Sequence, residues 1–144
     1  MKIPLSSYRI QFNPSFGFEE TGKIIPYLKN LGISDIYASP ILESKAGSKH
    51  GYDLINFSKI DHQLGGEKAF YHLARQIKKA QLGWMQDIVP NHMAYHPSNP
   101  FLYDVLEKGY KSIYSEYFDI NWRTNDSKLN GKLLFRQPAD EIWE

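Results

Sequence analysis

The amino-acid sequence predicts an α/β fold with parallel strands, and three observations carry that prediction. Short runs of β-forming residues occur at 7–12, 33–39 and 84–89. Two stretches with apolar residues at helical spacing, 19–31 and 67–81, lie between them. The resulting order of strand, helix, strand, loop, helix, strand indicates two consecutive βαβ units, in which the strands run parallel. Both an open doubly wound sheet and a closed barrel satisfy this order.

The individual elements have recognisable ends. The first strand, residues 7–12, gives way to the turn sequence NPSFG, and the first helix ends before Gly32. Pro26 lies inside that helix, and we expect it to kink or delay the helix because proline cannot donate the helical hydrogen bond. Pro40 closes the second strand. These endings fix three elements in the first third of the chain.

The middle of the chain contains a long segment without periodicity. Residues 40–66 hold four glycines, and loops of this length in a compact domain are usually functional or disordered. The second helix ends before Gly83, and the third strand ends at Pro90. After that proline come turn residues, a short helical stretch at 101–108 and irregular aromatic sequence.

Composition excludes several classes of protein. The chain has 144 residues, of which 42% are hydrophobic, enough for a sizeable core. Its net charge of +1 provides no basic surface for nucleic acid. No run approaches the roughly 18 apolar residues of a membrane span, and no signal peptide is seen. Cysteine is absent, which excludes disulfides and thiolate metal sites and fits a cytoplasmic location.

Two motifs fall where parallel α/β folds carry their chemistry, after the carboxyl ends of strands. HGYD, residues 50–53, lies in the loop after the second strand, and DIVPNH, residues 87–92, runs off the third. A carboxylate at Asp87, deep near a strand end, needs a cation or several hydrogen bonds to stay ionised. No arginine follows it closely, so we expect its partner to come from elsewhere in the fold.

The residues alone leave alternatives open at both motifs. Asn91 and His92 fit either a rim that binds a polyhydroxylated ligand or an ordinary turn after a strand. Gly51 and Tyr52 fit either a ligand platform or a glycine turn with a packed ring. Histidines and aspartates could be assembled into a metal site, but no pair has metal-ligand spacing, so no metal is expected.

Taken together, the motifs resemble those of the α-amylase superfamily. DIVPNH resembles its first signature segment, at the end of the third barrel strand, and HGYD resembles its tyrosine-bearing loop after strand two. More narrowly, residues 8–134 are similar to the maltooligosyl trehalose synthases. The ordered runs that carry this likeness are YRIQFNPSFGF, PYLKNLGIS, SPIL, GSKHGYD, LGGE, DIVPNHMA, DVLEKG and YFDINW.

The resemblance implies a fold and a function. The fold is the first three βα units of a (β/α)8 TIM barrel, over residues 1–90, followed by the truncated start of an inserted excursion, 91–144. The function is that of an intramolecular glucosyl transferase that converts the reducing-end α-1,4 linkage of maltooligosaccharides to α,α-1,1. The superfamily works by retaining double displacement with an aspartate and a glutamate. Neither is found in this chain, so we expect a fragment that is inactive alone.

The resemblance also implies roles for single residues. Tyr52 would stack beneath a glucose ring, and Asp53 would support its loop. Asp87 would brace the barrel interior. His92 would hydrogen-bond the primary hydroxyl of the same sugar, and Asn91 would anchor the following loop.

Two further expectations complete this reading of the sequence. Phe101 and Tyr103 occupy the place of sugar-binding tryptophans, although Leu102 departs from the pattern. The expected partner is a maltooligosaccharide or α-1,4-glucan, with no cofactor and no metal, and the oligomeric state is left open. An amylase-type hydrolase fragment and a stand-alone glucan-binding module are the alternatives.

Overall fold

The computed structural model describes residues 3–133, and the chain divides between Asn99 and Pro100 into two compact units. Within the first unit the elements are β1 (Ser7–Ile10), α1 (Phe18–Asn30), β2 (Asp35–Ala38), β3 (Leu42–Ser44), β4 (Leu54–Ile60), η1 (His62–Leu64), α2 (Gly66–Lys79) and β5 (Gly83–Gln86). The second unit contains α3 (Pro100–Lys108), η2 (Gly109–Lys111) and η3 (Ser115–Tyr117).

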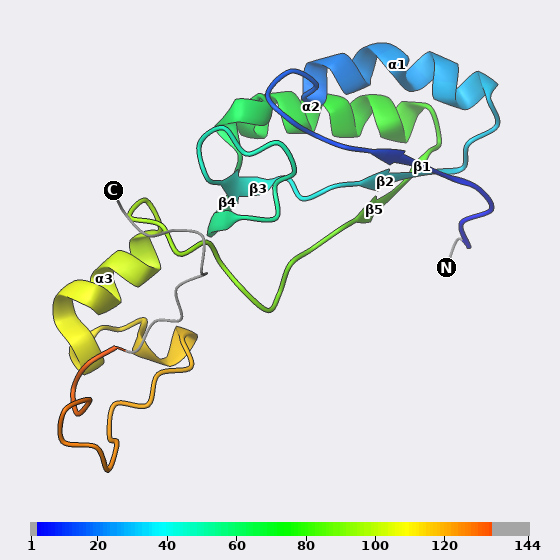
Figure 1. Ribbon diagram of the computed structural model, residues 1–144. Helices are drawn as coiled ribbons and strands as arrows, with labels where there is room; N and C mark the ends of the chain where they lie inside the picture. Colours follow the sequence, from blue (N-terminus) through cyan, green and yellow to red (C-terminus); the bar gives the residue numbers. More distant parts are fainter. Residues whose placement is uncertain (1–2, 134–144) are drawn as a thin grey trace. The chain divides into compact units, whose positions relative to one another are not determined.

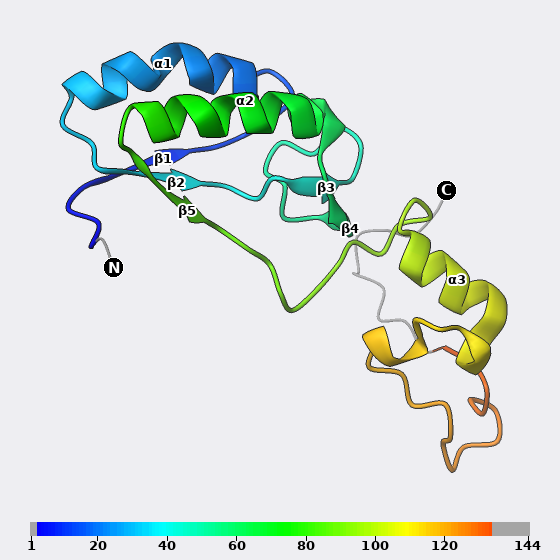
Figure 2. The ribbon, with the colours of Figure 1, turned by 180° about the vertical axis from the view of Figure 1, so that it is seen from behind.

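The first unit is built on a three-stranded parallel sheet in the order β1-β2-β5. The register places Arg9 opposite Tyr37 and Tyr37 opposite Met85. Helices α1 and α2 lie together over one side of these strands, as both ribbon views show (Figures 1 and 2). The parallel order predicted from the sequence is therefore confirmed: the first crossover runs through α1, and the second through the β3–β4 hairpin, η1 and α2.

The hydrophobic core lies between the sheet and the two helices. Phe12, Leu28, Ile36 and Leu73 are almost completely buried there. Because side chains alternate along a strand, burial of Ile36 under the helices turns its neighbours in sequence to the opposite face of the sheet. The whole buried cluster comprises Ile10, Phe12, Phe18, Ile25, Leu28, Ile36, Ala38, Ile41, Leu64, Leu73, Ile77 and Leu82.

Helix α1 begins after Gly17 and continues without interruption past Pro26. The amide of Gly17 donates to Glu20 Oε2 at 3.1 Å, which pairs one amide at the helix N-terminus. The expected delay at Pro26 does not occur, since the helix starts eight positions earlier and ends at Asn30. Pro26 is exposed, so its ring displaces no core side chain.

The long segment after β2 contains a hairpin that the sequence did not reveal. Strands β3 and β4 pair antiparallel, with register shifts on either side of Glu43. These irregularities disturb the alternation of side chains, and β4 has three successive buried residues, Leu54–Asn56, followed by exposed ones. Period-two alternation in the sequence therefore does not indicate either strand. The hairpin ends at Asp61, whose carboxylate accepts the amide of Gln63 at 2.8 Å and caps η1.

The parallel strands are shorter than predicted. The third strand ends at Gln86 rather than at residue 89, although the amide of Asp87 still donates to the carbonyl of Ala38 at 2.9 Å. Beyond that bond the chain leaves the sheet. Asp87 is thus fixed at the last point of contact with β2, at the carboxyl end of the sheet.

The second unit is organised around α3. Phe101, Leu102 and Val105 form the buried side of this helix. The ring of Phe101 packs edge-on against Tyr114, with centroids 5.0 Å apart. This places the predicted helical stretch at 101–108 on a real helix, one residue longer at its start.

Among residues 3–133, none of the helices combines the length and the apolar character needed to cross a membrane.

Candidate functional site

A cluster of four polar side chains forms at the carboxyl end of the parallel sheet. The phenol of Tyr52 donates a hydrogen bond to Asp87 Oδ2. Tyr37 Oη donates to the same oxygen at 3.2 Å. Arg9 Nη1 lies 3.3 Å from that oxygen, and Arg9 Nη2 donates to Tyr52 Oη at 2.8 Å. We call Arg9, Tyr37, Tyr52 and Asp87 the carboxylate cluster.

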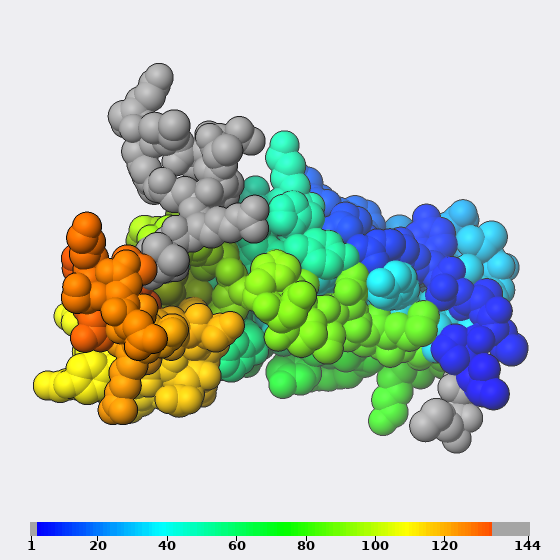
Figure 3. Space-filling view, turned by 60° about the horizontal axis from the view of Figure 1, so that its bottom comes forward, coloured from blue at the N-terminus to red at the C-terminus, as the bar shows by residue number. Residues whose placement is uncertain are grey.

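The topology explains why these four side chains meet. Arg9 on β1 and Tyr37 on β2 are register partners, and both alternate with residues buried beneath the helices. They therefore lie on the face of the sheet opposite α1 and α2. Asp87 follows β5 on the same face, and the loop between β3 and β4 brings Tyr52 to it. Figure 3 turns this side of the first unit forward, with β1 in blue and the segment after β5 in yellow-green.

Hydrogen bonding sets the protonation states within the cluster. The bond from Tyr52, followed by those from Arg9 and Tyr37, lowers the pKa of Asp87 below its usual 3.8 against an opposing effect of burial. The same bond to a carboxylate raises the pKa of Tyr52 above its usual 10.0. Asp87, whose side chain is 18% exposed, is therefore an anion at neutral pH and Tyr52 a neutral phenol. This arrangement keeps the charge of Asp87 paired.

The HGYD loop is held by its own polar contacts. Ser48 Oγ donates to Asp53 Oδ1 and accepts the amide of Gly51 at 3.0 Å. Gly51 has a φ of +75°, and an added Cβ would lie 3.0 Å from the Pro40 carbonyl oxygen. Both the positive φ and the nearby carbonyl oxygen therefore disfavour a side chain at this position. The carboxylate of Asp53 therefore accepts a hydrogen bond from within its own loop.

His50 contributes to the same loop. Its ring stacks on Tyr52 with centroids 5.9 Å apart and an interplanar angle of 29°. The backbone amide of Tyr52 donates to His50 Nδ1 at 3.0 Å, and Gln11 Nε2 donates to the His50 carbonyl at 3.1 Å. One side of the Tyr52 ring is consequently backed by another ring.

The structure does not bring every predicted site residue into this cluster. Asn91 and His92 are both exposed, and Asn91 Oδ1 lies 3.0 Å from His92 Nδ1. They follow Asp87 along the chain, and among the described residues neither forms a hydrogen bond or ring contact with Tyr52. Phe101 and Tyr103 lie in the second unit. There Phe101 is 9% exposed within the core of its unit, whereas Tyr103 is 58% exposed.

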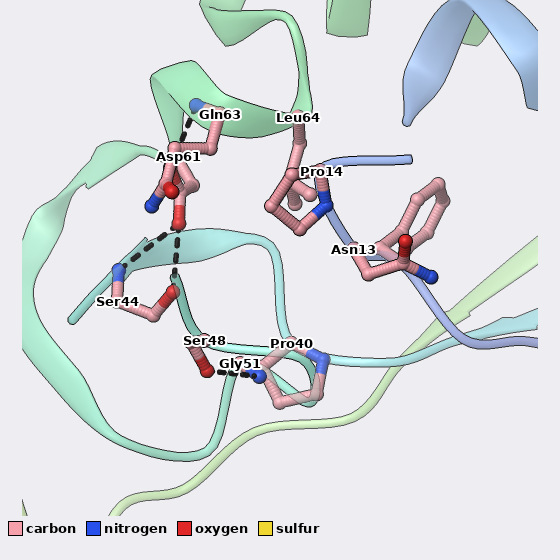
Figure 4. Close-up of a pocket in the computed structure, with 10 residues that line it drawn as sticks. Asn13, Pro14, Pro40, Ser44, Ser48, Gly51, Asp61, Gln63 and Leu64 are labelled. Atoms are coloured by element: carbon pink, nitrogen blue, oxygen red, sulfur yellow. Dashed lines mark hydrogen bonds between the residues drawn. The ribbon is translucent and has the colours of Figure 1, made fainter. Parts of the chain in front are cut away.

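A small hollow lies next to the HGYD loop but apart from the carboxylate cluster (Figure 4). Two of its polar side chains bond to each other, since Asp61 Oδ2 accepts from both the amide of Ser44, at 3.2 Å, and its hydroxyl, at 2.8 Å. These bonds join the hairpin to η1, so we assign this hollow a structural role. Its lining residues are Phe12, Asn13, Pro14, Pro40, Ser44, Ser48, Gly51, Asp61, Gln63 and Leu64.

Across the part of the chain that the structure describes, no group of three or more histidine and acidic side chains is arranged to hold a metal ion.

Arg9 and Tyr37 are the members of the cluster that sequence reasoning did not single out. The sequence did indicate that the partner of Asp87 would be distant, and Arg9 is 78 residues away. The available signal was strand alternation. In SYRIQF, Arg9 and Gln11 alternate with the core residues Ile10 and Phe12, at the carboxyl end of a parallel strand.

Comparison with known proteins agrees with this architecture. A family model described as the alpha amylase catalytic domain matches residues 21–143, so the chain belongs to that family. Its parallel strands and crossover helices are those of the (β/α)8 barrel, and the predicted fold class is confirmed.

Within the family, the chain is similar to maltooligosyl trehalose synthases. A protein of Mycobacterium tuberculosis (strain CDC 1551 / Oshkosh) assigned as such a synthase is 34% identical over 137 residues, which cover 90% of this chain and 18% of the relative. The solved structure of maltooligosyltrehalose synthase from Arthrobacter ramosus has a TM-score of 0.79 at 41% identity, covering 83% and 16%. A further crystal structure of a maltooligosyl trehalose synthase reaches 0.80 at 45% identity, covering 82% and 16%.

These matches confirm the narrower resemblance predicted from the ordered motifs. They also show how much of each relative this chain covers. The chain spans less than a fifth of the length of the three relatives described above.

Proposed function

We propose that this chain is part of a glucosyl transferase of the maltooligosyl trehalose synthase type and supplies one wall of its sugar-binding cleft. The observation that carries the proposal is the carboxylate cluster at the carboxyl ends of β1, β2 and β5. In a (β/α)8 barrel the helices lie outside, so the face that bears Arg9, Tyr37 and Asp87 is the inner one, and active sites form at the carboxyl ends of the strands.

The proposed roles follow from the contacts. Tyr52 offers an aromatic ring to the apolar face of a glucose unit, since sugar rings stack on aromatic side chains through their C–H groups. Asp87 braces the inner face, and Asp53 supports the HGYD loop. His92, exposed beyond β5, would donate a hydrogen bond to a sugar hydroxyl. Asn91 would anchor the loop that follows.

The proposed reaction moves the reducing-end glucose of a maltooligosaccharide from an α-1,4 to an α,α-1,1 linkage. Retaining chemistry on a glycosidic bond needs two carboxyl groups about 5 Å apart, one as nucleophile and one as acid. Among the described residues the cluster contains one carboxylate, Asp87. It is already bonded to Arg9, Tyr37 and Tyr52, so it is a poor nucleophile. We therefore expect the 144 residues to bind sugar without converting it.

Calorimetric titration of the purified chain with maltopentaose tests the binding role. We expect weak but saturable binding that Tyr52→Ala abolishes, while Tyr71→Ala, on the outer side of α2, leaves it intact. Incubation with maltopentaose should leave the number of reducing ends unchanged. A folded chain that binds no maltooligosaccharide would contradict the proposed cleft wall.

A chimaera tests the reaction. The aligned segment of the Arthrobacter ramosus enzyme is replaced by this chain, and reducing ends are counted during incubation with maltopentaose. Transfer to an α,α-1,1 linkage lowers the count without new ends, whereas hydrolysis raises it. A rise would favour the amylase-type alternative.

Two broader assignments are also proposals. The second unit is proposed to begin an excursion inserted after the third barrel strand. A cytoplasmic location is proposed from the absence of cysteine, and cell fractionation with an antibody to the chain would test it.

A further inference from the structure

We propose that Arg9 is a positioning residue that holds the phenol of Tyr52 on Asp87, so that Tyr52 offers a sugar its ring and not its hydroxyl. The identity of the ligand as a sugar rests on the proposed function. The positioning itself does not, because every contact involved is present without a ligand.

Arg9 bridges the other two residues with separate nitrogens. Nη2 donates to Tyr52 Oη at 2.8 Å and Nη1 lies 3.3 Å from Asp87 Oδ2. A planar guanidinium presents its donors in a fixed fork, so both acceptors are held at a set separation. That separation is the one at which the phenol reaches the carboxylate. A lysine ammonium at this position keeps the charge but lacks the fork.

Arg9 is itself oriented by its neighbours. Its guanidinium lies over the ring of Tyr37, 4.7 Å from the ring centroid, and Nη2 also donates to Gln11 Oε1 at 3.2 Å. Tyr37 in turn donates to Asp87. The guanidinium plane is therefore fixed by β1 and β2 before the HGYD loop contributes Tyr52. Because Arg9 is 39% exposed, ordering by these contacts matters more than burial.

The consequence concerns the chemistry that Tyr52 can offer. Its hydroxyl proton is committed to Asp87, and its oxygen accepts from Arg9. His50 stacks against one side of the ring. What remains for a ligand is the other ring face, an apolar surface that suits the C–H face of a pyranose. Specificity from this residue then depends on ring shape rather than on hydroxyl pattern.

The test follows the ionisation of Tyr52 in the full chain without ligand. Tyrosines carrying ¹³C at Cζ are titrated by NMR, and Tyr52→Phe assigns the signal among the ten tyrosines. In wild type the pKa of Tyr52 is above 10.0, chiefly through its bond to Asp87. In Arg9→Lys we expect it to fall towards 10.0, because the phenol leaves the carboxylate. An unchanged or higher pKa would overturn the proposal, since the phenol would then stay on Asp87 without the fork.

Arg75→Lys is the matched control. Arg75 is exposed on α2, so this substitution makes the same chemical change away from the carboxylate cluster. It should leave the Tyr52 signal unchanged. If Arg9→Lys fails to fold, Arg9→Gln is judged by the same criterion. In a parallel arm, Arg9→Lys should weaken maltopentaose binding by about tenfold. Absence of binding in wild type would count against the proposed function alone, while the NMR titration would still decide the role of Arg9.

Discussion

The phenolic hydroxyl of Tyr52 donates its hydrogen bond to the carboxylate of Asp87, across 35 positions of sequence. The two residues belong to different motifs, one in the loop between β3 and β4 and the other directly after β5. Their contact exists because β2 and β5 are neighbours in the parallel sheet, and the β3–β4 hairpin that carries Tyr52 follows β2 at the same carboxyl end where Asp87 follows β5. This single bond joins the two segments that the sequence had marked separately.

Removing the hydroxyl of Tyr52 should take one hydrogen bond from Asp87 and leave its bonds with Arg9 and Tyr37 in place. In Tyr52→Phe we expect the pKa of Asp87 to rise towards 3.8, because the bond from Tyr52 is the largest cause of its depression. The loss of one charge-assisted hydrogen bond near the surface should cost about 1 kcal/mol. Carboxyl ¹³C titration and urea unfolding measure the two effects. Tyr71→Phe, which removes an exposed hydroxyl on α2, should change neither.

Acid should remove the contribution of Asp87 to stability. Its pKa is lower in the folded state than the usual 3.8, so folding favours the carboxylate. The stabilisation is complete above the unfolded pKa and is lost as the pH falls through the folded pKa. Urea unfolding of wild type and Asp87→Asn should therefore differ at pH 7 and converge below pH 4.

A second carboxylate provides the control for that acid effect. Asp104, in the second unit, also has a lowered pKa because of its bond with Lys108. Adding Asp104→Asn to both proteins should leave the difference due to Asp87 intact. Persistence of the Asp87 difference at the lowest pH would contradict the assignment.

Gly17, the N-cap of α1, and Gly22, inside the helix, should respond differently to substitution by alanine. A Cβ at Gly17 would lie 2.6 Å from the backbone oxygen of Leu64, which cannot easily move. Gly17→Ala should destabilise the protein by about 2 kcal/mol. A Cβ at Gly22 would meet only the end of the Gln76 side chain, whose Oε1 is buried without a hydrogen-bond partner.

Gly22→Ala is therefore expected to be neutral or to stabilise by up to about 1 kcal/mol, because alanine favours a helix interior. Urea unfolding of the two variants side by side measures the contrast. Equal destabilisation would show that the Gln76 side chain is as immovable as the Leu64 backbone.

Phe101 and Tyr103, the two aromatic residues predicted to bind sugar on α3, should differ in how much each contributes to the free energy of unfolding. Phe101 is 9% exposed and packs against Tyr114 and Tyr117, so Phe101→Ala should cost about 3 kcal/mol. Tyr103 is 58% exposed, and Tyr103→Ala should change stability by less than about 0.5 kcal/mol. Near-ultraviolet circular dichroism during urea unfolding compares them. If maltopentaose uses this helix, only Tyr103→Ala should weaken binding while leaving the fold unchanged.

Sequence reasoning was strongest where periodicity is long and weakest where it is interrupted. It placed α1, α2 and α3 to within two residues at each end, because a helix repeats its apolar spacing over several turns. It missed β3 and β4, since a short hairpin with register shifts around Glu43 does not show simple alternation. It also gave too much weight to Pro26, whose place on the exposed side of α1 spares the core.

By itself the sequence determined the parallel βαβ order, the α-amylase family and the need of Asp87 for a distant partner. Only the tertiary structure decided that this partner is Arg9, and that Tyr52 completes the same cluster. The physical reason is that strand order and register bring residues 9, 37 and 87 together at the carboxyl end of the parallel sheet, and the β3–β4 hairpin adds residue 52. Such adjacency depends on which strands pair, and no local pattern of residues encodes it.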